Sequence, residues 1–143
     1  MHAGVPCNTW SSARFLDCDK PGYPKPMRTR DFPYGGDPAY PLSRAEARKC
    51  EMHTKIFRRT IEILECASAG SRAIIGLENP KDPGVAPKPS IFVTSEVNRL
   101  RDVSGSKDFV FDQCMFTLDY KKPTQVLSNA DLKDSLWKTS CQA

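Results

Sequence analysis

The sequence lacks a long hydrophobic run. Its longest uninterrupted apolar stretch covers residues 73–77, far below the roughly 18 residues that a membrane-spanning helix needs. The first fifteen residues include Pro6, Cys7, Asn8 and Arg14, whereas a secretory signal has a continuous apolar centre. We therefore expect an intracellular protein with no membrane partner.

The sequence also has little that could bind a metal. Its six cysteines stand at wide, irregular spacings with no Cys-x-x-Cys pair, and only His2 and His53 could join them. Structural zinc sites use closely spaced ligand pairs, so we expect no metal. In an intracellular chain we expect reduced thiols, most of them buried as small apolar residues.

What is present fits one globular domain. The chain has 143 residues, of which 39% are hydrophobic and 27% charged, and these values are typical neither of a disordered chain nor of a rod. Residues 1–59 hold eleven basic and six acidic side chains, while residues 60–143 hold ten and eleven. The N-terminal excess suits a phosphate-bearing partner such as nucleic acid, although many soluble domains carry such asymmetry with no polyanion to bind.

Proline divides this single domain, 1–143, into two parts. Six of the twelve prolines lie between residues 21 and 41, and four lie between residues 80 and 89. Neither stretch can be a regular helix or a central strand. We expect residues 1–42 to form a loop and a Pro-rich segment, either ordered or flexible, and residues 43–143 to form a core of helices and strands.

Residues 44–69 are predicted to form a helix. Ser43 and Glu46 have the spacing of a capping box, Phe57, Ile61 and Leu64 recur at helical spacing, and Gly70 can end the helix.

Further along the chain, the patterns predict a buried strand over residues 72–77, a helix near 90–101, strands over 109–114 and 125–127, a polar turn at 119–123, and a last helical turn from Asn129 to Trp137.

This order of elements is typical of an α/β layer architecture. The all-apolar strand at 72–77 would need a neighbour on each side, but only three residues precede Gly4, and we expect no strand there. The predicted sheet is therefore incomplete.

Two residues could carry chemistry. Cys7 lies in a turn-like Gly-Val-Pro-Cys segment, where N–H donors and Arg14 could stabilise a thiolate. Glu78 is expected directly after the strand, where α/β sheets place ligands, and a partly desolvated carboxyl there could donate a proton. The alternatives are a packed structural cysteine and a glutamate that faces water.

Three segments resemble motifs of the DNA cytosine-5 methyltransferases, in the same order along the chain. Gly4-Val-Pro6-Cys7-Asn-Thr-Trp-Ser11-Ser-Ala13 resembles their Gly-Pro-Pro-Cys-Gln-x-Phe-Ser-x-Ala loop. Leu77-Glu78-Asn79-Pro80 is similar to their Glu-Asn-Val strand end, and residues 120–128 faintly resemble their Tyr-Gly-Val-Pro-Gln-x-Arg-x-Arg hairpin. Nearly the whole chain also looks like eukaryotic coding regions associated with mobile-element polyproteins.

The resemblance implies an incomplete Rossmann-like, methyltransferase-like sheet with flanking helices. It implies that Cys7 attacks carbon 6 of a flipped-out cytosine in DNA, that Glu78 protonates nitrogen 3, and that S-adenosylmethionine donates the methyl group. The residues expected to contact the substrate are Pro6, Ser11, Arg14, Asn79, Lys121 and Lys122. A protein that acts on DNA would be nuclear.

The family's cofactor-binding turn precedes the Pro-Cys loop, so methylation would need sequence missing from this chain, such as the rest of a larger polyprotein. The alternative is a non-catalytic nucleic-acid-binding or interaction segment of a mobile-element protein, in which Cys7 is only a packed thiol. The two hypotheses differ in whether Cys7 and Glu78 share one pocket.

Overall fold

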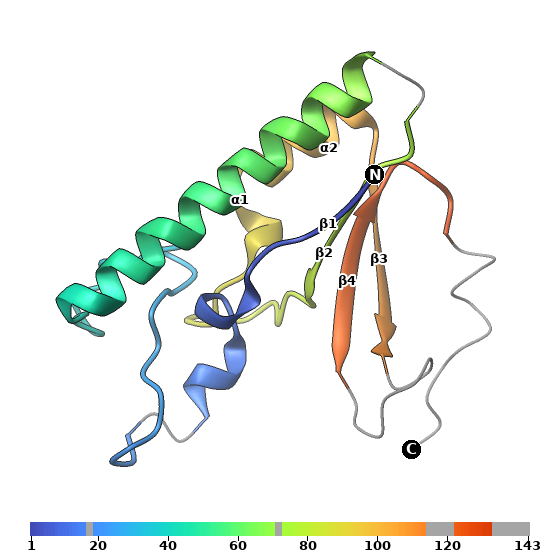
Figure 1. The fold of residues 1–143 in the computed structure, drawn as a ribbon. Coiled ribbons are helices and arrows are strands. Elements are labelled where there is room, and N and C mark those ends of the chain that lie inside the picture. The colour runs from blue at the N-terminus through green and yellow to red at the C-terminus, as the bar shows by residue number, and fades with distance from the viewer. Residues whose placement is uncertain (17–18, 71–72, 114–121, 133–143) are drawn as a thin grey trace.

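The computed structural model describes residues 1–16, 19–70, 73–113 and 122–132 of the chain, and shows a mixed α/β fold (Figure 1). The elements in chain order are β1 (His2–Gly4), the 3-10 helices η1 (Cys7–Thr9) and η2 (Ser12–Phe15), α1 (Arg44–Gly70), β2 (Gly76–Pro80), the 3-10 helix η3 (Ile91–Val93), α2 (Ser95–Ser104), β3 (Lys107–Asp112) and β4 (Pro123–Ser128).

The four strands form one mixed sheet in the order β1-β2-β4-β3. Strands β1 and β2 are parallel, and the crossover between them contains α1. Strand β4 is antiparallel to both of its neighbours, β2 and β3. A parallel pair extended by an antiparallel hairpin is a common form of mixed sheet.

Both helices cover the same face of the sheet. Leu77 of β2 pairs with Leu127 of β4, so their side chains point to one side. Both are buried in a single apolar core with residues of α1 and α2. This core comprises Val5, Trp10, Phe57, Ile61, Leu64, Ile75, Leu77, Ile91, Phe92, Val97, Leu100 and Leu127.

The predicted long helix is confirmed as α1. The Ser43 backbone N–H and hydroxyl donate to Glu46 Oε2 at 2.8 and 2.7 Å, and the Glu46 N–H donates to Ser43 Oγ at 3.3 Å. These bonds form the predicted capping box. The second predicted helix is confirmed in part, because residues 91–93 form a separate 3-10 turn before α2.

The strand predictions need correction. The strand predicted at 72–77 lies at Gly76–Pro80, because Pro80 is tolerated as the last residue of a strand, where it pairs with Thr124. The expectation of no strand before Gly4 is wrong, since His2–Gly4 is enough to pair with β2. The strand therefore does have a neighbour on each side, as its burial required. The last two predicted strands lie at 107–112 and 123–128.

Asn129 has a different role from the predicted helix cap. Its side-chain oxygen accepts from the Ile75 N–H at 2.9 Å, and its amide donates to the Ala73 carbonyl at 3.0 Å. The Asn129 side chain thus fixes residues 73–75, which lead into β2. The predicted helical turn is wrong for residues 129–132, which form no helix. Residues 133–137 of that turn, and most of the predicted turn at 119–123, lie outside the described residues.

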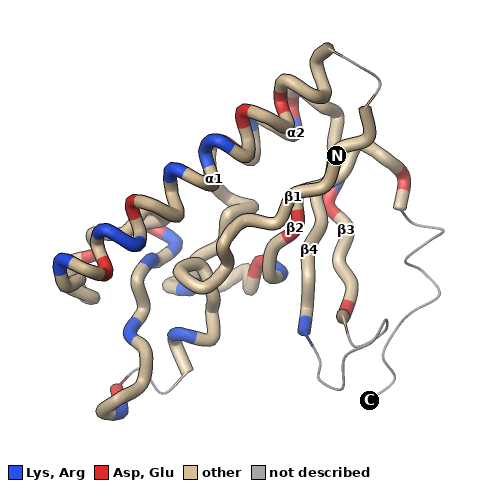
Figure 2. The backbone as a smooth tube through the Cα atoms, viewed as in Figure 1, with Lys and Arg blue, Asp and Glu red and all other residues tan. Residues whose placement is uncertain are grey.

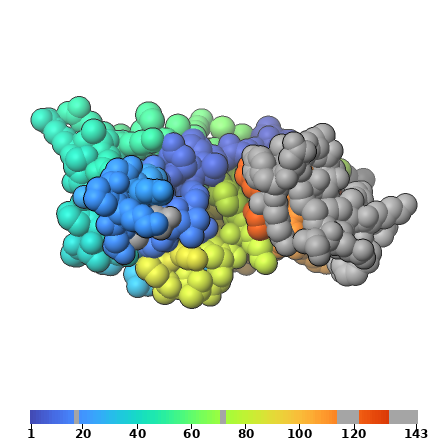
Figure 3. Space-filling view, turned by 90° about the horizontal axis from the view of Figure 1, so that it is seen from below, coloured from blue at the N-terminus to red at the C-terminus, as the bar shows by residue number. Residues whose placement is uncertain are grey.

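The Pro-rich segment is packed against the rest of the molecule. Residues 26–29 are buried. Seen from below, the segment lies beside the second proline-rich stretch (Figure 3), where the Arg30 N–H donates to the Pro87 carbonyl at 2.9 Å. The Arg30 guanidinium also pairs with Asp82 at 2.8 Å. The segment is therefore an ordered loop.

Candidate functional site

Glu78 lies directly beside the backbone of Gly4. The two residues are register partners in the parallel β1-β2 pair. A Cβ atom on Gly4 would stand only 3.2 Å from Glu78 Oε2, so the carboxylate occupies the space that a larger side chain would fill. Glycine at this position lets the carboxylate lie over β1.

Glu78 belongs to the sheet face opposite the helices. Gly4, Glu78, Val126 and Phe109 form one row of register partners across all four strands, and the neighbouring row contains Leu77 of the core. The expectation that Glu78 follows its strand is wrong, because β2 continues to Pro80. Gln113, just after β3, lies near the carboxylate, with 3.5 Å between Gln113 Nε2 and Glu78 Oε1.

Asn79 holds the loop that leads to Cys7. Its side chain is buried, and Nδ2 donates to the Val5 carbonyl at 3.3 Å. The bond joins β2 to Val5, which lies two residues before Cys7 in the chain. The resemblance assigned Asn79 to substrate contact, and in the structure its side-chain amide bonds to the backbone of this loop.

Cys7 follows the carboxyl end of β1 and begins η1. Its side chain is half-buried, and its carbonyl accepts from the Trp10 N–H at 2.9 Å. Cys7 lies three positions after Gly4 in the chain, which limits the distance between their Cα atoms to about 11 Å. Chain connectivity thus limits how far the thiol can lie from Gly4, the register partner of Glu78.

The loop after Cys7 is held by its own polar residues. Pro6 precedes η1, and Ser11 Oγ accepts from the Ala13 N–H at 3.2 Å at the start of η2. Arg14 Nε donates to the Asn8 carbonyl at 2.6 Å and Nη1 to the Lys25 carbonyl at 2.8 Å. Arg14 therefore shapes the loop through the backbone.

Of the two lysines predicted to contact substrate, Lys122 directly precedes β4. The carbonyl of Lys122, a half-buried residue, accepts from the Gln113 N–H at 3.0 Å. This bond connects Lys122 to the residue beside Glu78. Lys121 lies outside the described residues.

A buried arginine that the sequence did not single out clamps the loop to α1. Arg28 is 1% exposed. Its Nε donates to Thr9 Oγ1 at 3.0 Å and its Nη2 donates to the Cys50 carbonyl at 2.7 Å. Its Nη1 donates to the Pro33 carbonyl at 2.8 Å and to Thr54 Oγ1 at 3.0 Å. Arg28 thus connects η1, the Pro-rich segment and α1.

These four acceptors are neutral, so the charge of Arg28 is stabilised by dipoles. Its guanidinium also stacks on the Trp10 ring at 4.2 Å. Burial lowers the pKa of Arg28 to about 10, and the group stays charged at neutral pH. Nearby, Thr9 Oγ1 lies 3.2 Å from His53 Nδ1. The pKa of His53 is lowered by burial and by the charges of Arg28 and Lys49.

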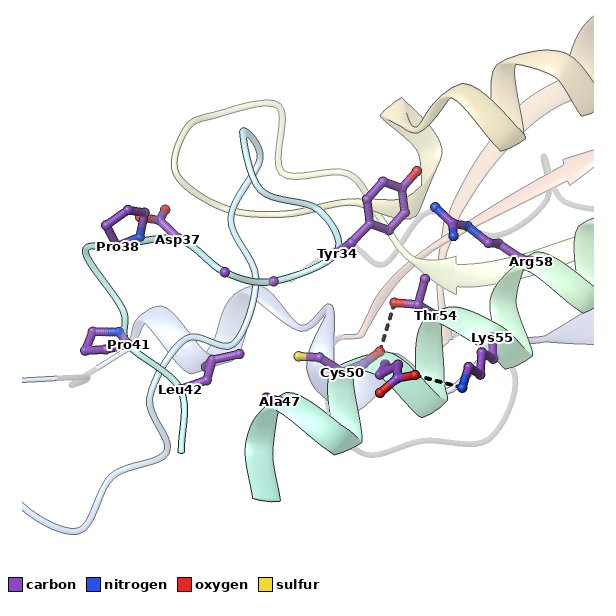
Figure 4. Close-up of a pocket in the computed structure, with 13 residues that line it drawn as sticks. Tyr34, Asp37, Pro38, Pro41, Leu42, Ala47, Cys50, Thr54, Lys55 and Arg58 are labelled. Atoms are coloured by element: carbon purple, nitrogen blue, oxygen red, sulfur yellow. Dashed lines mark hydrogen bonds and ion pairs between the residues drawn. The ribbon is translucent and has the colours of Figure 1, made fainter. Parts of the chain in front are cut away.

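A cavity of about 730 Å³ lies between the Pro-rich segment and α1 (Figure 4). Leu42 and the thiol of Cys50 form an apolar side, and Tyr34 and Arg58 lie at the other end. Arg58 stacks on Tyr34 at 4.7 Å and pairs with Glu96 at 2.9 Å. Neither Cys7 nor Glu78 lines this cavity.

The described cysteines differ in burial. Cys50 is buried, Cys7 half-buried and Cys66 exposed, and all three are free thiols. The expectation of mostly buried cysteines therefore fails for Cys66. In the described part of the chain, no cluster of three or more His, Cys, Asp or Glu residues could hold a metal ion.

A membrane-crossing helix is likewise not found among the described residues. No family model matches the chain, and neither a curated protein nor a solved structure is similar to it.

Proposed function

We propose that the chain is a diverged or partial cytosine-5 methyltransferase-like domain with a Rossmann-like sheet, in which Cys7 is the nucleophile and Glu78 the acid. The observation that supports it best is the β1-β2 register, in which the Glu78 carboxylate lies over Gly4, three residues before Cys7. Gly4 is the last residue of β1, and open α/β sheets bind their ligands beyond the carboxyl ends of their parallel strands.

The chemistry assigned to these residues is a reversible addition to cytosine. The Cys7 sulfur forms a bond to ring carbon 6, the electrons of the 5,6 double bond move toward carbon 5, and Glu78 gives a proton to nitrogen 3. Carbon 5 is then nucleophilic and can take a proton from water. Loss of the original carbon 5 hydrogen to water as a proton, departure of the sulfur as a thiolate and return of the nitrogen 3 proton to Glu78 restore the base.

Neither Cys7 nor Glu78 lines the large cavity, so this proposal does not place S-adenosylmethionine there. The large cavity belongs to the Pro-rich segment and α1, and two of its carboxylates are already engaged: Asp37 by the Thr29 hydroxyl and Glu51 by Lys55. Methyl transfer would need binding residues from elsewhere, so this proposal assigns no residue of the chain to it.

Release of hydrogen from carbon 5 tests the addition without the cofactor. We expect the chain to release tritium from DNA that contains 5-tritiated cytosine, and Cys7→Ser or Glu78→Gln to abolish the release. Gly4→Ala should reduce it at least several-fold, because the new Cβ displaces the carboxylate. Gly70→Ala is the matched control, since nothing lies within 4 Å of its Cβ.

A folded wild-type chain that binds DNA and releases no tritium would contradict the proposal. Trapping gives a second measurement: DNA with 5-fluorocytosine, supplied with S-adenosylmethionine, forms a lasting adduct only when a cofactor site is also present. Release without trapping is the result expected of a partial domain.

A second candidate function is nucleic-acid binding without catalysis. Lys25, Arg44, Arg48 and Lys49 lie along the Pro-rich segment and the first turns of α1 (Figure 2). Contacts between such side chains and phosphates make affinity fall with salt. If these residues contact duplex DNA, Lys25→Gln, Arg44→Gln and Arg48→Gln should each reduce the salt slope of log affinity by about 0.9. This candidate predicts salt-dependent binding with no tritium release.

A further inference from the structure

Helix α1 exposes an apolar stripe on the side away from the sheet. Met52, Ile56 and Ile63 are 53%, 43% and 43% exposed. At about 100° per residue, the three lie within about 40° of one another around the helix. The buried Phe57 and Ile61 lie on the opposite side. Figure 1 shows α1 at the edge of the molecule, with no described element covering its outer side.

The stripe has the spacing of a coiled-coil seam. Its residues follow one another at alternating steps of three and four: Lys49, Met52, Ile56, Arg59, Ile63 and Cys66. This spacing keeps one line of side chains facing a partner helix. From Lys49 to Cys66 the seam is about 26 Å long, which is long enough for several layers of contact.

We propose that two copies of the chain pair through antiparallel α1 helices along this stripe. In this arrangement Met52 packs against Ile63 of the second copy, and Ile56 packs against the aliphatic stem of Arg59 of the second copy. The two-fold axis makes each contact occur twice. The proposal does not depend on the function of Cys7 and Glu78.

The charges on the helix favour the antiparallel orientation. A parallel pair would place Arg59 opposite its own copy and Lys49 opposite its own copy. The antiparallel pair instead brings Lys55 next to Glu62 of the second copy, on both sides of the axis. Both side chains are available, with 76% and 54% exposure, and an ammonium group has donors for more than one carboxylate.

The mixture of charges beside the stripe distinguishes a second copy from a lipid surface. Helices that lie on anionic membranes carry mainly Lys and Arg on their polar face. Here Glu51 and Glu62 lie with Lys55 along one edge of the stripe, next to Arg59 within it. A surface of both signs is complementary to itself when one copy is reversed.

Light scattering over rising protein concentration tests self-association. We expect the mass to rise to twice that of the chain, and Ile56→Asp or Ile63→Asp to hold the mass at one chain with unchanged circular dichroism. Val103→Asp is the matched control, because Val103 is 56% exposed on α2, outside the stripe. It should leave the dimer intact.

Charge exchange tests the orientation. Lys55→Glu should weaken the dimer at least tenfold, because it places like charges together twice, and Lys55→Glu with Glu62→Lys should restore it.

Cysteine pairing tests the register in a Cys66→Ser background. Met52→Cys with Ile63→Cys should form a disulfide between copies at 52–63, located by peptide mapping. Met52→Cys alone should not, because the two copies of residue 52 lie about 16 Å apart along the seam.

A chain that stays monomeric at all concentrations overturns the proposal, as does a dimer that survives Ile56→Asp. A 52–52 disulfide would overturn the antiparallel orientation. Binding of the monomer to vesicles of anionic phospholipid, abolished by Ile56→Asp, would assign the stripe to a lipid surface instead.

Discussion

Arg28 shows how one side chain can determine the position of a loop. A guanidinium is the only side chain with five N–H donors in a rigid fork, and Arg28 uses this geometry to reach Thr9, Pro33, Cys50 and Thr54. Thr9 lies two residues after Cys7. The loop that carries the thiol is therefore anchored to α1 through a buried cation.

We predict that Arg28→Lys lowers the free energy of unfolding by about 3 kcal/mol, because the ammonium group keeps the buried charge and loses most of the hydrogen bonds. Urea denaturation measures this change. Arg48→Lys is the control, since Arg48 is an exposed residue of α1 and should change stability by less than about 0.5 kcal/mol. Equal effects of the two substitutions would show that Arg28 is not a clamp.

For single residues, the sequence predicted part of the candidate site. Cys7 and Asn79 stood out because their neighbours resemble a known motif, and Asn79 does hold the loop. Arg28 could not be singled out, since arginine is almost always exposed and its neighbours Met27 and Thr29 give no periodic signal. Only the tertiary packing of the Pro-rich segment buries it.

Helix α1 is the element whose ends the sequence predicted best, because the patterns that mark a helix join residues close together in the chain. The capping box joins residues three apart, and the apolar period repeats over several turns. The strands were less predictable because their limits depend on register with distant partners. The three residues of β1 have no pattern of their own and are a strand only because β2 lies beside them.

We predict that Ser43→Ala lowers the free energy of unfolding by about 1 kcal/mol, the usual cost of losing an N-cap. The backbone N–H and the hydroxyl of Ser43 hold the pKa of Glu46 below its usual value of 4.5. In the variant, that pKa should therefore rise toward 4.5. Thermal denaturation and NMR titration of the Glu46 carboxyl measure both effects.

The control for this substitution is Ser68→Ala, near the other end of α1. The Ser68 hydroxyl donates to the Glu65 carbonyl within the same helix at 2.9 Å, and it caps no helix start. Its loss should change stability by less than about 0.5 kcal/mol and leave the pKa of Glu46 where it is. Equal losses of stability in the two variants would show that the capping box does not stabilise α1.

In the molecule as a whole, Glu96 joins the Pro-rich segment, α1 and α2. Its carboxylate accepts from the Tyr34 hydroxyl and pairs with Arg58, while Glu96 itself lies in the first turn of α2. Burial alone would raise the pKa of Glu96, but the hydrogen bonds from Tyr34, Arg58 and Ser95 outweigh it and lower the pKa. Glu96 thus favours folding in its charged form.

We predict that acid unfolds the protein in two stages. The lowered pKa of His53 means that folding favours the neutral ring, so stability is lost first as pH falls below 6.5. Glu96 and Asp82 also have lowered pKa values; they stabilise the fold above their ordinary values of 4.5 and 3.8, and this contribution is lost as pH falls through the folded values.

The melting temperature measured from pH 8 to pH 3 tests both stages. Glu96→Gln should lower the melting temperature at pH 7 and make its decline below pH 4.5 shallower. Asp102→Asn, at an exposed position on α2, should leave the profile unchanged. A profile that stays flat below pH 6.5 would contradict the assignment.

The smallest strand of the sheet makes contacts across half the chain. His2 pairs with Gly76, and such a distant contact gains its stability only after a long loop has closed. With three residues, an edge position and one neighbour, β1 is where the sheet can fray at the lowest cost in free energy. Each fraying event would release residues 2–4 from β2, while Arg28 and Asn79 still hold the Cys7 loop against the folded core. The first strand could thus open and close without carrying the thiol with it.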